Sequence, residues 1–348
     1  MNELFRSLDG PLSRTVHVNG QSYLYFGGTA YLGIPQNPDF IALHTEGIKK
    51  FGLNNGTSRS NNIQLGIYDE AEYVAAKRFS AESALISSSG YLAAQLTVQT
   101  LECFGQIIFA PSTHPALWLD GKPQPPASSF AEWKEKVVAK INSVSQKNWV
   151  LISNSMNNLI PEIYNFEFLQ YIHPDKNILL IVDDSHGIGV NNKGLSAFTD
   201  LIKLKNVECI LVASMAKALG VDAGLVLGSE KMIRRLKQSN TFVGASPPSA
   251  AALYAFIHGE KIYHQAWEKL QHNMAHFEAA IDLTFEYERG FPAYLIQRHH
   301  LVKELMSQNI LISSFPYPNP DSEPVTRIVL SSWHEPEDIN AIITAIKN

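Results

Sequence analysis

Six short apolar runs between residues 81 and 228 constrain the fold more than any other feature of the chain. They are rich in Ile, Val and Leu and alternate with helix-length stretches such as Tyr91–Cys103 and Ala131–Ser143. The six runs are Ser83–Ser87, Gln106–Ala110, Trp149–Ser153, Ile178–Asp183, Cys209–Ser214 and Gly224–Gly228. Continuous apolar runs suit strands that are buried on both faces of a sheet. The alternation therefore predicts an α/β architecture, with a mostly parallel central sheet and helices on both faces.

The two ends of the chain follow a different pattern. Ser22–Phe26 is short and β-like, and a helical stretch is expected from residue 250 to about Glu286. Two strands and a terminal helix are then expected at Leu311–Phe315, Thr326–Leu330 and Glu335–Lys347. We predict a large α/β domain over residues 35–250 and a smaller α+β domain that both termini form, from residues 1–34 and 251–348.

Composition indicates a globular protein and excludes several classes. The 348 residues are 45% hydrophobic, which is enough for a sizeable core. The net charge is −5 and no basic stripe occurs, so nucleic acid is not an expected partner. The two cysteines, Cys103 and Cys209, cannot form a disulfide scaffold or a Cys-based zinc site, and no metal site is expected. No apolar run reaches about 18 residues and no signal peptide is evident, so we expect a cytoplasmic protein without a membrane partner.

Reactive residues follow two neighbouring predicted strands where these strands end. Ligands of open parallel sheets bind beyond the carboxyl ends of the strands. One run ends at Asp183 and continues through Asp184 and Ser185 to His186, and the next ends at Ser214 shortly before Lys217. The separation of Asp183 and Lys217 is about the length of one strand–helix–strand unit. We therefore expect an Asp, a His and a Lys together at one edge of the sheet.

Two further segments leave predicted strands at the same kind of position. Ser87-Ser88-Ser89-Gly90-Tyr91 opens a helix, so its N–H groups and hydroxyls suit a phosphate, and Phe109-Ala110 leads towards His114. A phosphate site, a carboxylate, a reactive lysine and a flat ring together indicate pyridoxal phosphate (PLP) chemistry. In that chemistry the lysine amine bonds to the cofactor carbonyl, and an aspartate keeps the pyridine nitrogen protonated so that the ring accepts electrons. A partly dry lysine has its charged form disfavoured, which frees the amine for attack on a carbonyl.

Competing motifs do not occur in the chain. It contains no Gly-x-Gly-x-x-Gly after a strand, no Walker A loop, no His-Glu-x-x-His and no Gly-x-Ser-x-Gly. Nicotinamide enzymes, P-loop NTPases, zinc proteases and α/β-hydrolases therefore lack their main signature here.

Several segments carry a family resemblance that extends from about Tyr23 to the C-terminus. They are Tyr31-Leu32-Gly33, Ser89-Gly90-Tyr91, the run from Val182 to Val190, the run from Ser214 to Gly220, and Arg327-Ile328-Val329-Leu330. On these segments the sequence resembles the α-oxoamine synthases, a branch of the fold type I PLP-dependent transferases. That branch includes 8-amino-7-oxononanoate synthase, 2-amino-3-ketobutyrate coenzyme A ligase, 5-aminolevulinate synthase and serine palmitoyltransferase.

The resemblance implies roles for four residues around the cofactor ring. Lys217 would hold PLP covalently and move the α-proton of the substrate. Asp183 would pair with the pyridine nitrogen, His186 would bond to the ring hydroxyl, and His114 would stack on the ring. Three of these residues also have a structural interpretation: Asp183 as a helix cap, Lys217 as a surface charge and His114 as an isolated structural histidine.

The resemblance also implies contacts to the phosphate and to the substrate. Gly90 and Tyr91 would offer backbone amides to the phosphate, with help from Ser214. Arg327 would bind the carboxylate of the amino acid, although an arginine on a strand surface is the alternative. Thr29 stands where the family usually has a substrate-contacting Asn, and Ala30 replaces the following Asp. The cofactor residues are thus retained, whereas the substrate positions 29 and 30 have changed.

These matches imply a C-acyltransferase that condenses a small amino acid with an acyl-CoA or acyl-carrier thioester, usually with loss of carbon dioxide. The expected activity is similar to that of 8-amino-7-oxononanoate synthase in biotin synthesis. Family members are usually homodimers with the active site at the interface, and the Ser246-Pro247-Pro248 turn would reach towards the partner's cofactor. An aminotransferase or another amino-acid-modifying enzyme is one alternative, and a non-catalytic subunit is another. Retention of Lys217 argues against the last.

Overall fold

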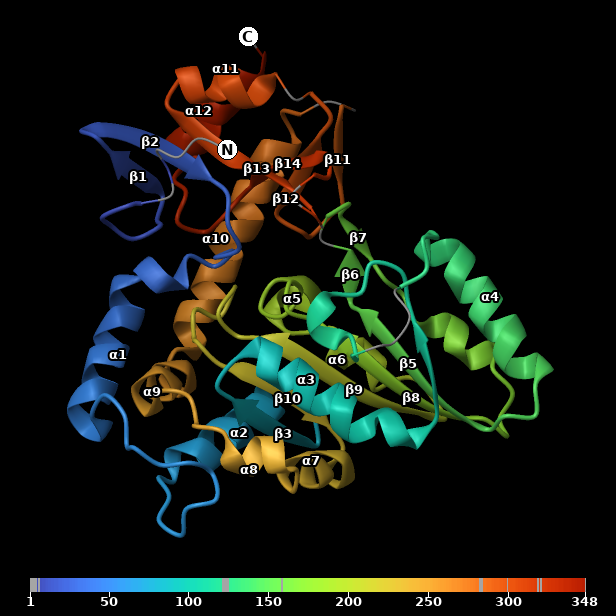
Figure 1. Cartoon of the computed structure of the whole chain (residues 1–348). Coiled ribbons are helices and arrows are strands. Elements are labelled where there is room, and N and C mark those ends of the chain that lie inside the picture. Colours follow the sequence, from blue (N-terminus) through green and yellow to red (C-terminus); the bar gives the residue numbers. More distant parts are fainter. Residues whose placement is uncertain are drawn as a thin grey trace.

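Two six-stranded sheets and one two-stranded sheet organise the chain (Figure 1). The structure is a computed structural model, and it describes residue 5 and residues 7–120, 125–157, 159–281, 284–298, 300–317, 319 and 321–347. Within these ranges the helices are α1 (Pro38–Phe51), α2 (Ile67–Arg78), α3 (Gly90–Leu101), α4 (Phe130–Ser143), α5 (Asn191–Gly194), α6 (Phe198–Leu201), α7 (Glu230–Lys237), α8 (Asn240–Gly244), α9 (Ala250–His258), α10 (Glu260–Glu278), α11 (Leu301–Ser307) and α12 (Pro336–Lys347).

The central sheet has the strand order β3-β10-β9-β8-β5-β4. Its strands are β3 (Ser83–Ser87), β4 (Gln106–Phe109), β5 (Asn148–Asn154), β8 (Asn177–Asp183), β9 (Val207–Ser214) and β10 (Gly224–Gly228). Neighbours from β4 to β9 pair in parallel, whereas β10 is antiparallel to both β9 and β3. The six apolar runs are therefore the six strands of one mostly parallel sheet, as the sequence predicts.

Burial on both faces explains why these strands are continuously apolar. In β8, Leu180 and Val182 belong to one apolar cluster, while Leu179 and Ile181 belong to another. Successive side chains of a strand point to opposite faces, so neither face of β8 meets water. Helix α3 packs on β9 and β10, and α2 and α7 pack on β3.

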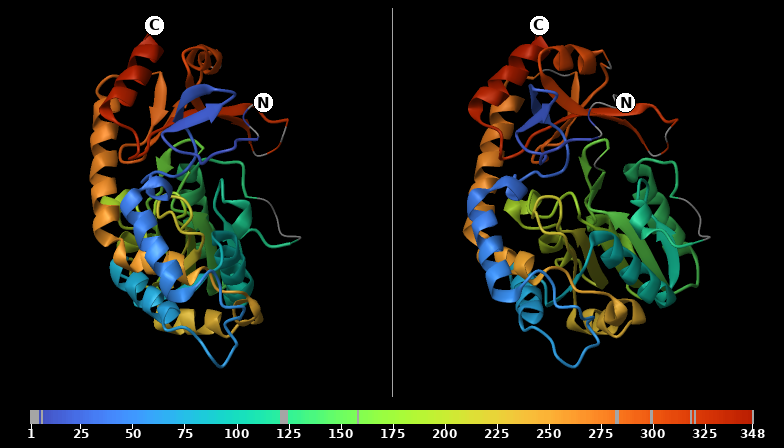
Figure 2. Two further views of the ribbon diagram at one scale, coloured as in Figure 1. Left: turned by 90° about the vertical axis from the view of Figure 1, so that its left-hand side faces the viewer. Right: turned by 60° about the vertical axis from the view of Figure 1, so that its left-hand side comes forward.

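The second sheet is built from both ends of the chain, in the order β1-β2-β13-β14-β12-β11. Its strands are β1 (Thr15–Val18), β2 (Gln21–Phe26), β11 (Phe285–Tyr287), β12 (Ala293–Ile296), β13 (Ile310–Pro316) and β14 (Pro324–Val329). Strand β2 pairs in parallel with β13, which joins the N-terminal hairpin to the C-terminal strands. Figure 2 shows α10 along one side of the molecule, past both sheets. The division of the chain into two domains at the boundaries given above stays a prediction.

The sequence-based assignment is wrong in part of this second sheet. The helical stretch expected to reach about Glu286 ends at Glu278, and Phe285 already belongs to β11. Phe285 is buried opposite Ile296 of β12, so strand pairing overrides the local helical pattern there. The short strands β1, β11 and β12, and the small hairpin of β6 (Met156–Asn157) and β7 (Glu162–Ile163), were not expected.

Candidate active site

The polar ends of the central strands meet at one edge of the sheet. The strand register places Asp183 beside Asn154 of β5, and it places Gly224 between Ser87 and Ser214. The side chain of Ser185 links the segment after β8 to the end of β9, because its Oγ accepts a hydrogen bond from the N–H of Ser214 at 2.8 Å. The topology therefore brings together the segments that carry Asp183, His186, Gly90 and Lys217.

Lys217, His186 and Tyr31 form a hydrogen-bonded row. The Nζ atom of Lys217 lies 3.0 Å from Nε2 of His186, and Nδ1 of His186 lies 2.8 Å from the hydroxyl of Tyr31. A neutral imidazole has one donor and one acceptor nitrogen, and a phenol is a good donor. The favoured arrangement has Tyr31 donating to Nδ1, so that the imidazole proton on Nε2 faces the amine of Lys217.

Burial favours the neutral forms of this row. It lowers the pKa of the Lys217 amine, and Arg327 lowers it further, although Asp183 raises it. Burial also lowers the pKa of His186 well below its ordinary value, with the charges of Lys217 and Arg327 acting in the same direction. A lysine with a lowered pKa has a larger fraction of free amine at neutral pH, which is the form that attacks a carbonyl or accepts a proton.

Asp183 and His114 lie beside this row and are held by their own backbones. The Oδ1 atom of Asp183 accepts a hydrogen bond from the N–H of Ser185 at 2.8 Å. The Nδ1 atom of His114 accepts from the N–H of Ala116 at 3.1 Å, so the neutral ring carries its proton on Nε2. Partial burial lowers the pKa of His114, Asp183 raises it and Lys217 lowers it, which places the ring in the field of both charges. The structure thus brings His114 and Asp183 to Lys217.

The start of α3 provides a cradle that suits a phosphate. A Cβ atom on Gly90 would lie 2.5 Å from Cβ of Ser214, so only glycine lets this helix approach the end of β9 so closely. Ser89 caps the helix by accepting from the N–H of Leu92 at 3.1 Å. The N–H groups of Gly90 and Tyr91 therefore stand at the helix N-terminus beside Ser214, where the helix dipole favours an anion.

Arg327 reaches the site from the second sheet. It lies on β14, opposite Ser313 of β13, and only 4% of its surface is exposed. Its charge lowers the pKa values of Lys217, His186 and Tyr31, so its guanidinium shares their electrostatic environment. A guanidinium in this position suits a planar carboxylate.

Thr29 is half-buried in the connection between the two sheets. The N–H of Gly28 donates to Oγ of Ser313 at 3.3 Å, and Tyr31 follows two residues after Thr29. The backbone on either side of Thr29 is therefore held near β13 and near His186. This places Thr29 close to the row but gives its side chain no assigned contact.

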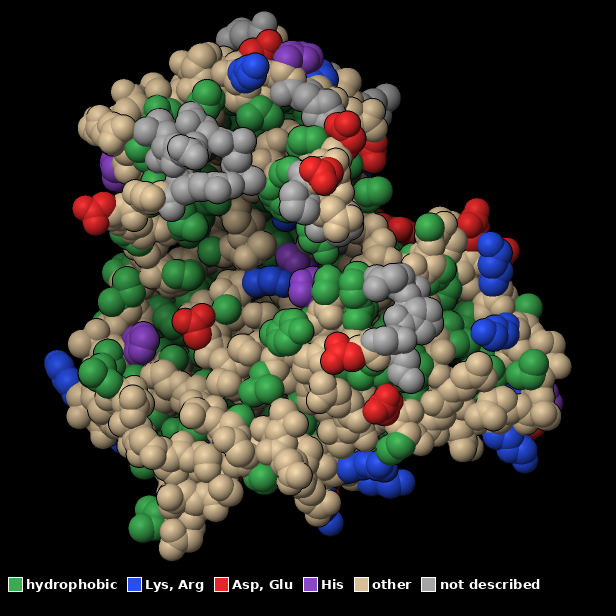
Figure 3. All heavy atoms as spheres, in the orientation of Figure 1, with side chains coloured by type: hydrophobic (Ala, Val, Ile, Leu, Met, Phe, Trp, Pro, Cys, Tyr) green, Lys and Arg blue, Asp and Glu red, His purple; other side chains and the backbone are tan. Residues whose placement is uncertain are grey.

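Tyr31 and Asn154 are site residues that the sequence reasoning did not single out for a role. The side-chain Oδ1 of Asn154 accepts from the N–H of His114 at 3.1 Å, and its Nδ2 donates to the carbonyl of Ser112 at 2.6 Å. Asn154 is a polar residue at the end of an apolar run, and this signal could have identified it. In the space-filling view, histidine and basic side chains gather in the hollow between the parts that hold the two sheets (Figure 3).

The residues present fit PLP. The fit rests on the chemistry of the groups present. They are the Lys217 amine with its lowered pKa, the Asp183 carboxylate, the neutral His186 imidazole, and the N-terminus of α3, which Gly90 allows to lie close to the end of β9. Among the described residues, no group of three or more His, Cys, Asp or Glu side chains could hold a metal ion. In the same part of the chain, no helix combines the length and apolar character that a membrane span needs.

Asp184 is a fully buried carboxyl directly beside this site, and it gives the protein an expected pH dependence. Burial raises the pKa of Asp184 to about 7, and the charge of Asp183 also raises it, whereas the N–H of Ala197, which donates to Oδ2 at 2.9 Å, lowers it. The folded state therefore binds this proton more tightly than the unfolded state. The stabilising contribution is complete below pH ~4 and is lost as the pH rises through about 7, at a cost of about 4 kcal/mol.

We expect the free energy of unfolding of the wild type to fall between pH 4 and 7 relative to that of Asp184→Asn. Urea titrations across this range measure the difference. Asp200→Asn removes an exposed carboxylate and serves as the control. If the wild type and Asp184→Asn follow parallel curves, Asp184 does not titrate in this way.

The model of the aminotransferase class I and II family matches residues 30–346. Among curated proteins, 8-amino-7-oxononanoate synthase of Petrotoga mobilis is 24% identical over 358 aligned positions, covering 96% of this chain and 90% of that protein. The corresponding enzyme of Paraburkholderia phymatum is 26% identical over 319 positions, covering 86% of this chain and 78% of that protein.

Solved structures show the same fold. Serine palmitoyltransferase of Sphingomonas wittichii has a TM-score of 0.80 at 16% identity, over 98% of this chain and 90% of that one. A structure of SPT with PLP has a TM-score of 0.81 at 15% identity, over 98% and 91%. The 8-amino-7-oxononanoate synthase of Francisella tularensis has a TM-score of 0.67 at 20% identity, over 93% and 97%. These likenesses confirm the expected fold type I architecture, and the curated relatives confirm the resemblance to the α-oxoamine synthases. Because the family model spans nearly the whole length, the chain belongs to the aminotransferase class I and II family.

Proposed function

We propose that the protein is a PLP-dependent C-acyltransferase that condenses a small amino acid with an acyl-CoA or acyl-carrier thioester, as an 8-amino-7-oxononanoate synthase does. The observation that carries this proposal is the meeting of Lys217, His186 and Asp183 at one edge of the central sheet, with Arg327 of the second sheet in the same electrostatic environment. The relatives named 8-amino-7-oxononanoate synthase, aligned along 96% of the chain in one case, support the reaction class. Biotin synthesis is the pathway that this proposal implies.

PLP, when bound, supplies an electron sink for a carbanion at the substrate Cα. The lone pair of the neutral Lys217 amine would take the Cα proton, and His186, whose Nε2 lies 3.0 Å from that nitrogen, would bond to the ring hydroxyl of the cofactor. The carboxylate of Asp183 would hold a proton on the pyridine nitrogen. His114 would cover the ring, and the N–H groups of Gly90 and Tyr91, with Ser214, would hold the phosphate.

Arg327 would fix the amino acid through its carboxylate, with Thr29 close to the same position. Its burial in β14 supports this role, because a buried guanidinium binds a carboxylate with little competition from water. In the acyl transfer itself, a C–C bond forms between Cα and the thioester carbonyl carbon, the C–S bond breaks, and a thiol leaves. Carbon dioxide is lost afterwards in the decarboxylating members of the family.

Thiol release tests this proposal. We expect the purified, PLP-loaded protein to release thiol only when an acyl-CoA and an amino acid are both present, with alanine, glycine and serine compared. The rate should depend on both concentrations, because the carbanion must be generated before it attacks the thioester. Conversion of the cofactor to its amine form by the amino acid, without thiol release, would identify an aminotransferase instead. If neither signal arises with CoA or carrier-protein thioesters, the protein does not catalyse this chemistry.

A second copy of this chain is the proposed partner. The connection between α1 and α2 carries Leu53 and Ile63, each 77% exposed, and Tyr73 on α2 is 68% exposed. Exposed large apolar side chains in one segment of the chain support a protein–protein contact, and Figure 1 shows the connection between α1 and α2 projecting from the lower end of the molecule. A mass of twice 38.7 kDa in solution is what a homodimer requires. The contact of the Ser246-Pro247-Pro248 turn with the partner's cofactor belongs to the same proposal.

A further inference from the structure

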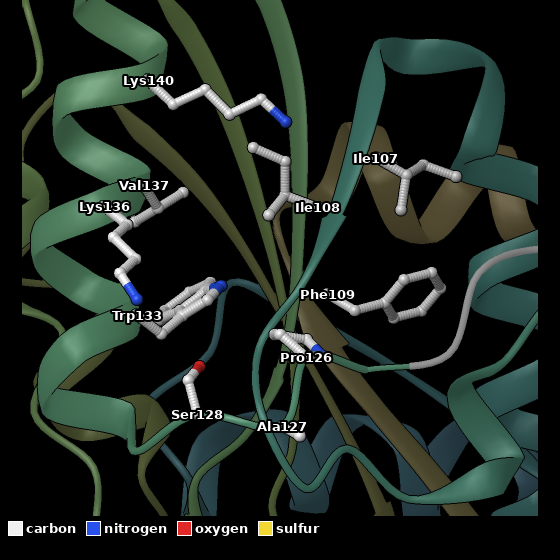
Figure 4. Close-up of a pocket in the computed structure, with 10 residues that line it drawn as sticks. All are labelled: Ile107, Ile108, Phe109, Pro126, Ala127, Ser128, Trp133, Lys136, Val137 and Lys140. Atoms are coloured by element: carbon white, nitrogen blue, oxygen red, sulfur yellow. The ribbon is translucent and has the colours of Figure 1, made fainter.

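A groove of about 520 Å³ lies at the outer edge of the central sheet, between β4 and α4 (Figure 4). Its walls are mostly apolar and include Ile108 and Phe109 of β4, Val137 of α4 and Pro126. The volume falls in the range of roughly 300–1,000 Å³ that is typical of small-molecule sites. None of the residues of the candidate active site lines it.

The groove contains a buried donor without an acceptor. Trp133 is 4% exposed, and its Nε1 has no hydrogen-bond partner among the residues that the structure describes. The indole packs against Phe130 and Phe168, with ring centroids 5.4 and 5.8 Å away. Figure 4 shows its nitrogen on the side that faces β4 across the groove. A buried N–H without a partner is costly, so this position suits an acceptor oxygen from a ligand.

Two ammonium groups stand beside this donor. Lys136 and Lys140 are exposed residues that line the groove from α4, one helical turn apart. Lys136 lies 4.0 Å from the exposed carboxylate of Glu132, and Lys140 has no ion pair within the described ranges. The groove therefore combines apolar walls, one oriented N–H donor and a positive rim.

We propose that this groove binds an anionic amphiphile, independently of the reaction at the sheet edge. The apolar chain would lie between Ile108 and Val137, and an oxygen of the head group would accept from Nε1 of Trp133. The negative head group would lie near Lys136 and Lys140, because their two ammonium groups attract a negative charge. A carboxylate and a phosphate share this chemistry, and the experiment distinguishes them.

The test follows the indole N–H resonance of Trp133 in the 15N-labelled, PLP-loaded protein. Five tryptophans give five indole signals, and Trp133→Phe identifies the relevant one. Decanoate, decyl phosphate and uncharged decanol are titrated at low salt. We expect decanoate or decyl phosphate to shift the Trp133 signal, and the tighter of the two identifies the head group. Decanol should bind at least about tenfold more weakly, because it lacks the charge.

Two double variants separate the groove from general charge effects. Lys136→Ala/Lys140→Ala should weaken binding of the anion about tenfold, and the loss should shrink at high salt. Lys134→Ala/Lys147→Ala removes the same charge from lysines that do not line the groove, and it should change the affinity less than about twofold. An unmoved Trp133 signal would overturn the proposal, as would equal affinity for decanol or equal losses in both double variants.

Discussion

Lys217→Ala should lower kcat/KM for thiol release by at least about 10³-fold, because in the proposed function this one residue is both the covalent anchor of the cofactor and the base. The Nζ atom of Lys217 lies 3.0 Å from Nε2 of His186, and burial lowers the pKa of the amine. We also expect PLP to be lost on gel filtration, since the remaining contacts hold it only non-covalently.

Two measurements check this prediction independently. Thiol release reports the reaction, and the visible absorbance of the protein after gel filtration reports retention of the cofactor. Lys203→Ala is the matched control, because Lys203 pairs only with Asp200 at an exposed site and should change neither readout. A Lys217→Ala protein that keeps both the absorbance and the rate would remove Lys217 from the mechanism.

The central sheet could be predicted from the sequence because its strands, apart from the edge strand β4, are buried on both faces. Residues 178–182 read as an unbroken apolar run for that reason, and the chemistry at their carboxyl ends follows from the topology of parallel sheets. The strands β1, β11 and β12 escaped prediction, since three or four residues carry too little periodicity to be distinguished from loops. Their pairing is decided by tertiary contacts between the two ends of the chain.

The part of the site that follows the ends of β8 and β9 could be predicted from the sequence. Asp183, His186 and Lys217 meet because one strand–helix–strand unit separates them, which the spacing itself indicates. Tyr31 is 155 positions from His186 in sequence, and their contact depends on how the segment after β2 crosses to the central sheet. The groove at Trp133 had no signal at all in the sequence, because it depends on an unpaired N–H that only the packing of α4 creates.

Asp183→Asn should lower kcat/KM by roughly 10³-fold, equivalent to about 4 kcal/mol of transition-state stabilisation. In the proposed function, the carboxylate of Asp183 would hold a proton on the pyridine nitrogen, and an uncharged amide would lack the negative charge that stabilises this proton. The fold should survive, because the Oδ1 of an asparagine can still accept the hydrogen bond from the N–H of Ser185 that the carboxylate accepts at 2.8 Å.

The adjacent carboxyl supplies the matched comparison for this last prediction. Asp184→Asn also replaces a carboxyl by an amide, but Asp184 is fully buried, its Oδ2 accepts a hydrogen bond from the N–H of Ala197, and the proposed function gives it no role. We expect its kcat/KM to stay within about threefold of the wild type at pH 6, where much of Asp184 is already neutral. A comparison of kcat/KM for thiol release between the two variants shows whether the reaction needs the negative charge at Asp183 or at either position of the Asp-Asp pair. Equal losses in the two variants would mean that the segment matters as a structural unit, whereas loss in Asp183→Asn alone assigns the charge to Asp183.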